Sequence, residues 1–193
     1  TENTVTAVLP VMHNPTLGNV GLLMRLWSVV LAGNLIGTAV AAWAFNYMPI
    51  FDEPTRQAFV SIAEDVMKNS PTEMFANAII SGWLVATMVW MFPVAGAAKI
   101  VVIILMTWLI ALADTTHIVV GSVEILYLVF NGNLPWSDFI WPFALPTLAG
   151  NICGGTFIFA LLSHAQIRND MSSKRKAEAR AQAAEKGKKA DRA

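Results

Sequence analysis

The chain has few charged residues and almost no cysteine. Charged side chains make up 13% of its 193 residues, about half of the roughly 25% that is typical of soluble domains. Cys153 is the single cysteine, so neither an intrachain disulfide nor a cysteine metal cluster can form. The sequence also contains no phosphate-binding loop, no zinc-ligand spacing and no G-x-S-x-G turn. These absences argue against a soluble enzyme, and we expect no cofactor and no bound metal.

The charges are unevenly distributed along the chain. Nine of the 13 Lys and Arg residues lie in residues 166–193, together with four acidic residues, whereas residues 1–165 hold four basic and nine acidic residues. The chain therefore divides into an apolar body, 1–165, and a basic tail, 166–193. The tail lacks an aromatic or glycine pattern for nucleic-acid binding. We expect it to be solvated, with contact to anionic membrane lipids as the alternative.

Long stretches without charge predict membrane-spanning helices. The bilayer core is about 30 Å thick, so a spanning helix needs about 20 apolar residues. Windows of this length predict spans at about 26–48, 74–95 and 139–162. The polar stretch 64–73 is expected to be a loop or a short surface helix.

A fourth apolar window, residues 99–130, is too long for one ordinary span. A straight helix of this length would measure about 48 Å. Polar residues interrupt the window at 113–117, where the sequence reads Ala-Asp-Thr-Thr-His. We therefore predict two half-helices joined by irregular backbone. At membrane depth such backbone survives only where protein buries it or where it lines a cavity, and broken helices form binding sites in transporters.

The basic residues predict how the protein is oriented. Because Lys and Arg are enriched on the cytoplasmic side of membrane proteins, the basic tail should be cytoplasmic. Four spans then place Arg25 and Lys99 on the same side. The loop 52–73, with five acidic residues against two basic ones, falls outside. All loops agree with a multi-pass protein whose C-terminus is cytoplasmic.

A short motif occurs twice, 117 residues apart. Ala-Gly-Asn-Leu-Ile-Gly-Thr at 32–38 resembles Ala-Gly-Asn-Ile-Cys-Gly-Gly-Thr at 149–156. The predicted topology runs the two copies in opposite directions, which is typical of an inverted repeat; chance similarity is the alternative. Small residues allow close helix approach in lipid, and asparagines there need hydrogen-bond partners. We therefore assign helix packing to Gly33, Asn34, Gly37, Gly150, Asn151 and Gly154.

The offset also predicts how much of the repeat the chain contains. It places the counterpart of the polar break just before Thr1. We therefore expect an all-α transmembrane bundle with broken helices and inverted repeats. The chain would hold about four and a half of six spans, with the others upstream.

His117 is the leading candidate for a functional side chain. A titratable residue at mid-membrane depth is by default a functional candidate, and an imidazole changes its charge near neutral pH. In a narrow pore His117 would attract an anion and then donate a proton to it; alternatively, it only joins two backbone segments. Asp114 would either hold His117 by a hydrogen bond or cap the second half-helix with Thr115 or Thr116. Glu124 would line a vestibule or pair at a subunit interface.

The chain resembles the formate/nitrite transporter family, and within it a bacterial inner-membrane branch. His117 matches the central histidine of that family, and Thr1 matches the threonine that faces it. Val85 and Ile110 are similar in position to residues that constrict the pore. The Gly-Asn pairs of the repeated motif match pairs in the third and sixth helices. The resemblance thus assigns pore or substrate contact to His117, Thr1, Asp114, Thr116, Val85 and Ile110.

The resemblance implies an aquaporin-like fold and a homopentamer in the bacterial inner membrane. Each protomer would carry its own pore for small monovalent anions of the formate and nitrite type. The sequence departs from the family pattern near the filter: Thr116 replaces a glutamate, and Gly82 and Gly121 replace asparagines. These departures leave two alternatives open. The protein would carry a different small solute, or it would be a non-transporting scaffold or sensor that acts through its tail.

Overall fold

The computed structural model describes residues 7–8, 11 and 14–158, and all regular elements among them are helices, which confirms the all-α class. The described residues fall within one unit of the chain, Thr1–Phe159. Thr1, the tail 166–193 and the end of the predicted span 139–162 lie outside the described residues.

Helix α2, Leu17–Tyr47, is one of two helices that are long and apolar enough to cross a membrane. It begins well before the predicted residue 26, because Thr16 caps it: the Thr16 hydroxyl accepts a hydrogen bond from the Asn19 N–H at 3.2 Å. The prediction treated the charge of Arg25 as a boundary. Arg25 is exposed, and its long side chain can reach polar surroundings, so the helix continues past it.

The polar stretch 64–73, predicted as a loop or a short surface helix, is shared between the ends of two helices. Helix α3, Glu53–Met67, covers its first residues, and the Asp52 side chain caps this helix by accepting a hydrogen bond from the Thr55 N–H at 3.2 Å. A short turn then leads to Ser70, which forms a capping box with Glu73 at the start of the next helix. The capping box sets the start of that helix because it satisfies two free N–H groups at once.

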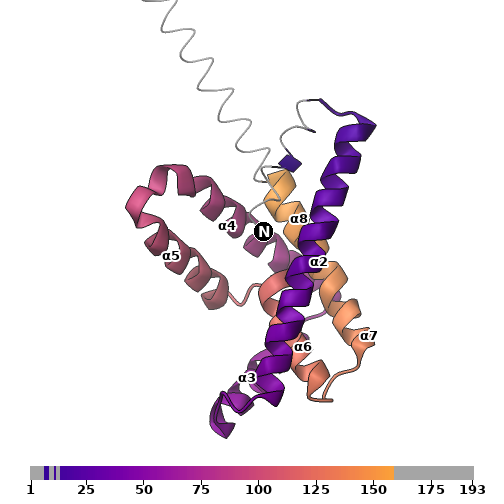
Figure 1. Ribbon diagram of the computed structural model, residues 1–193, viewed down its shortest axis with the longest axis vertical. Helices are drawn as coiled ribbons and strands as arrows, with labels where there is room; N and C mark the ends of the chain where they lie inside the picture. Colours follow the sequence, from indigo (N-terminus) through magenta and orange to yellow (C-terminus); the bar gives the residue numbers. More distant parts are fainter. Residues whose placement is uncertain (1–6, 9–10, 12–13, 159–193) are drawn as a thin grey trace, which may run out of the picture. The chain divides into compact units, whose positions relative to one another are not determined.

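Helix α4, Pro71–Ala95, and helix α5, Lys99–Leu112, form a hairpin joined by the short helix η1, Gly96–Ala98. Gly96 adopts a φ of 50°, which favours glycine and lets the chain reverse here. Figure 1 shows α5 returning beside α4. The stretch Pro71–Leu112 is the second one with the length and composition to cross a membrane. No residue of α5 is buried, so its apolar side chains face outward for lipid or protein.

The break in the long apolar window lies where the polar residues predict it. Helix α5 ends at Leu112, and helix α6, Ile118–Phe130, begins after His117. Helix α7, Trp136–Asp138, precedes the predicted span at 139–162. The described part of that span is divided into the π-helix η2, Phe139–Ala144, helix α8, Leu145–Ile152, and the π-helix η3, Cys153–Ile158. Trp141 is non-helical because the following Pro142 disfavours helical geometry at the residue before it.

Helix α6 forms the centre of the packing. It contacts α2 and α3, while α8 packs against α4, and α2 and α8 run in opposite directions (Figure 1). Ile125 and Leu126 on α6 are buried. Phe59 of α3 stacks on Phe45 of α2 with ring centroids 6.0 Å apart and meets Tyr127 of α6 edge-on at 5.8 Å. These aromatic contacts join the three helices.

A candidate site at the helix break

The backbone between α5 and α6 is held by its own polar residues. Asp114 has a φ of 49°, a left-handed conformation that few residues other than glycine adopt. Thr115 then folds back onto α5, because its hydroxyl and its N–H both donate to the carbonyl of Ile110, at 3.0 and 3.2 Å. These bonds satisfy a carbonyl at the end of α5 that would otherwise lack a helical partner.

Helix α4 fixes the other side of the break. The buried Thr116 hydroxyl donates to the carbonyl of Met74 at 2.8 Å. The hydroxyl of Ser81, which is also fully buried, donates to the carbonyl of Thr116. Thr116 is thus bonded on both its side chain and its backbone, which makes it a structural anchor of the break.

Asn151 of α8 binds the start of α6. Its Oδ1 accepts a hydrogen bond from the N–H of Ile118 at 2.9 Å. Its Nδ2 donates to the carbonyl of Ala78 at 2.8 Å and to the hydroxyl of Ser81 at 2.9 Å. One amide therefore ties α4, α6 and α8 together at the break. The repeated motif predicted that Asn151 needs partners, but it did not predict which ones.

The glycines of the second motif copy, Gly150 in α8 and Gly154 in η3, bring these two segments onto α4. A Cβ added to Gly150 would collide with the carbonyl oxygen of Phe75, and one added to Gly154 would collide with that of Ile79. In the first copy, no described residue lies within 4 Å of a Cβ added to Gly33 or Gly37. Among the described residues, only the second copy therefore forms a tight helix contact.

Asn34, the counterpart of Asn151 in the first motif copy, bonds only within its own helix among the described residues. Its Nδ2 donates to the carbonyl of Val30 on its own helix at 2.9 Å. It therefore joins no two helices among the described residues, and its assignment to helix packing stays a prediction.

The close contact of α4 and α8 also bears on the departure that the resemblance implies at Gly82. A Cβ added to Gly82 would lie 2.5 Å from the backbone oxygen of Asn151, a distance that real Cβ atoms do not show. An asparagine at this position could not be accommodated without separating the two helices.

His117 lies at the junction and is unpartnered. It is the N-cap residue of α6 and has extended backbone, with φ −131° and ψ 132°. Its side chain is 8% exposed, and neither ring nitrogen has a hydrogen-bond partner among the described residues. No side chain of the break caps α6, and the N–H of Ile118 is bonded by Asn151 of α8 instead. The expectation that Asp114, Thr115 or Thr116 caps this helix is therefore wrong, because both threonines bond to α5 or α4 and Asp114 is exposed in the left-handed turn.

A cavity of about 210 Å³ opens beside His117. Residues of α2, α4, the start of α6 and the α8–η3 segment line it, among them Trp27, Leu31, Val85, His117, Leu148 and Asn151. Water takes about 30 Å³ per molecule in the liquid, so the cavity admits a small solute with a few waters. The structure brings the predicted residues His117 and Val85 together here. Ile110, Asp114 and Thr116 are not among its lining residues, and Thr1 lies outside the described residues.

Sequence reasoning missed two residues of this region, Trp27 and Ser81. Ser81 is a polar residue in an otherwise apolar window, which is a usable signal for a buried hydrogen bond in a membrane helix. Trp27 carries no such signal, because a tryptophan in an apolar helix most often faces lipid near the membrane surface. Among the described residues, no cluster of His, Cys, Asp or Glu could hold a metal ion.

A buried titratable residue at a helix break, beside a small cavity between apolar helices, is the kind of site found in membrane transport proteins. The chain belongs to the formate/nitrite transporter family, whose model matches residues 1–165. It is 84% identical over 183 residues to "Inner membrane protein YfdC" of Escherichia coli (strain K12), and the match covers 95% of this chain. The chain spans 59% of the length of that relative. No solved structure matches it.

Proposed function

We propose that the chain forms part of a transmembrane pathway for small monovalent anions, with His117 at its centre. One observation carries the proposal: the buried imidazole lines a cavity of about 210 Å³, and both of its ring nitrogens lack a partner among the described residues. A buried polar group without a partner costs about 1–3 kcal/mol. A solute that passes through the cavity would supply the missing partner.

The charges around the cavity favour an anion over a cation. Helix α6 begins at the break next to His117, and a helix N-terminus carries a positive partial charge that suits anions. Among the described residues, those that line the cavity include no Asp or Glu. A cation would therefore meet no carboxylate there, whereas an anion would meet a helix N-terminus and a group that can carry positive charge.

Family membership supports the substrate class. The family is described by formate and nitrite transport, and both are small monovalent anions. We extend the proposal to a location in the bacterial inner membrane with a cytoplasmic C-terminus, to a homopentamer with one pore per protomer, and to a non-enzymatic role. The name of the E. coli relative agrees with the location.

The test is anion uptake by proteoliposomes that contain the intact protein. Formate and nitrite would be offered between pH 5 and 8 to wild type, His117→Ala and the control Val120→Ala. Val120 lies on the same helix, is 56% exposed and does not line the cavity. We expect uptake by wild type and by the control, and much lower uptake by His117→Ala, because that variant lacks the unpartnered ring nitrogens that line the cavity.

Folded protein that takes up neither anion would refute the proposal. It would leave a different small solute or a non-transporting scaffold or sensor as the function. Uptake that is the same in wild type and His117→Ala would refute the role of His117 while leaving the anion pathway in place.

A further inference from the structure

We infer that Trp27 is a second anion-binding residue, whose indole N–H donates a hydrogen bond into the cavity that His117 lines. The inference rests on the proposed function and deepens it, because it assigns a specificity-determining side chain to the same pathway.

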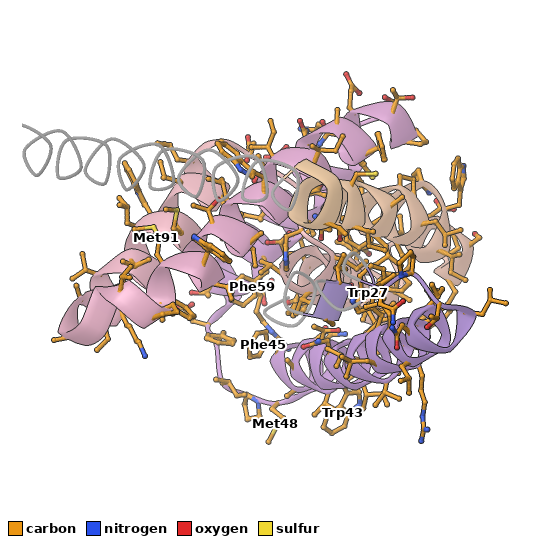
Figure 2. The ribbon with its side chains drawn as sticks, turned by 90° about the horizontal axis from the view of Figure 1, so that it is seen from above. Trp27, Trp43, Phe45, Met48, Phe59 and Met91 are labelled. Carbon is orange, nitrogen blue, oxygen red and sulfur yellow. The ribbon has the colours of Figure 1, made fainter. Side chains whose placement is uncertain are left out.

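The indole N–H of Trp27 lacks an acceptor among the described residues. Trp27 lies on α2 and lines the cavity, and Figure 2 shows it between α2 and α8. Its Nε1 is buried and has no hydrogen-bond partner among the described residues. Buried tryptophans usually pair this N–H group, and leaving it unpaired costs free energy. A ligand in the cavity would supply the acceptor.

The side-chain amide of Asn151, another polar group beside the cavity, already has hydrogen-bond partners. Asn151 also lines it, but both ends of its amide are bonded, to Ile118 on one side and to Ala78 and Ser81 on the other. The buried and unpartnered side-chain groups of the lining are therefore those of Trp27 and His117. They come from two different elements, α2 and the start of α6.

The indole of Trp27 and the imidazole of His117 can both donate hydrogen bonds. An indole N–H only donates hydrogen bonds, and an imidazole donates through one nitrogen when neutral and through both when protonated. A pair of donors selects a ligand that accepts, and an anion with two oxygens can accept from both rings. Carboxylate and nitrite ions have this form. A cation cannot use the indole N–H at all.

The inference can be tested by observing the indole directly. The intact protein would be labelled with ¹⁵N at its tryptophan indoles, purified in detergent and titrated with sodium formate or sodium nitrite. The Trp27 resonance is identified by its absence from Trp27→Phe. We expect it to shift with anion concentration until it saturates. The resonance of Trp43, on the same helix but 51% exposed and not lining the cavity, should stay in place.

Uptake kinetics provide a second readout. Trp27→Phe keeps an aromatic ring and removes only the donor and part of the ring volume. Loss of a hydrogen bond to a charged group predicts a KM for formate that rises about tenfold, with a smaller change in maximal rate. Trp43→Phe should leave both values unchanged. A purely structural role of Trp27 would instead lower the maximal rate and the amount of folded protein together.

The outcomes separate this inference from the proposed function. A Trp27 resonance that does not move with either anion, or an unchanged KM in Trp27→Phe, overturns the inference even if His117-dependent uptake is observed. A saturable shift of Trp27 in protein that shows no uptake supports the binding role and counts against the transport function.

Discussion

The side-chain oxygen of Asn151 accepts a hydrogen bond of 2.9 Å from the backbone N–H of Ile118. This bond joins α8 to the start of α6, next to the imidazole of His117. The same amide donates two hydrogen bonds toward α4. The position of the histidine at the cavity therefore depends on a residue of a different helix.

Replacing Asn151 with Ala should strongly destabilise the protein. The substitution leaves the buried N–H of Ile118 without an acceptor, and an unsatisfied buried group costs about 1–3 kcal/mol. We expect a lower thermal midpoint in detergent, and His117-dependent uptake that falls even in the protein that stays folded. The control is Asn77→Ala on α4, because the side chain of Asn77 makes no hydrogen bond to a described residue. Equal midpoints for both variants would contradict this account.

Replacing Gly154 with Ala should separate η3 from α4. The new methyl group would collide with the backbone carbonyl of Ile79, and backbone cannot move aside as a side-chain end can. We expect loss of stability of about 1–3 kcal/mol or more, seen as reduced yield of monodisperse protein and a lower thermal midpoint. The control Gly21→Ala, with no described residue near the added methyl group, should be neutral or slightly stabilising. Similar yields of the two variants would speak against the close contact.

Substitutions of Asp114 should distinguish the effect of its left-handed backbone conformation from the effect of its carboxylate. Because its φ is 49°, Asp114→Gly should keep or raise the thermal midpoint, whereas Asp114→Val should destabilise by about 1–2 kcal/mol. Asp138, with an ordinary φ of −79°, is the control, since Gly there should not stabilise. If Asp114→Gly is stable but loses anion uptake, the carboxylate itself contributes to the pathway. A stable Asp114→Val variant would contradict the left-handed geometry.

Asp52 should contribute to the acid sensitivity of the polar region. Hydrogen bonds from the Thr55 hydroxyl and N–H lower the pKa of Asp52 below its ordinary value of 3.8. A carboxyl with a lowered folded-state pKa stabilises the fold above its unfolded pKa, and this contribution is lost as pH falls through the folded pKa. The thermal midpoint of wild type should therefore fall between pH 6 and pH 3 more than that of Asp52→Asn. Parallel curves for the two proteins would rule out this contribution.

Much of the helical framework can be predicted from the sequence for a clear physical reason. A polar run such as 113–117, inside an apolar window too long for one span, marks where the helix can break, because lipid cannot satisfy freed backbone groups but the protein around such residues can. The start of α2 was predicted less well, because the cap at Thr16 outweighs the charge of Arg25. The kink at Trp141 and Pro142 was missed because the window was judged by its lack of charge, although Pro142 is itself a signal that interrupts a helix.

The amino-acid sequence by itself determined that this chain is an apolar, all-α member of a membrane transport family with a histidine at a helix break. Charge-free length, polar interruption and the repeated glycine-asparagine motif are local properties, and each has a local physical cause. Only the tertiary structure decided that Thr116 is bonded to α4 and does not cap α6, and that Trp27 and His117 line one cavity. These relationships join residues that are distant in the chain, and they depend on how closely Gly150 and Gly154 let α8 and η3 approach α4.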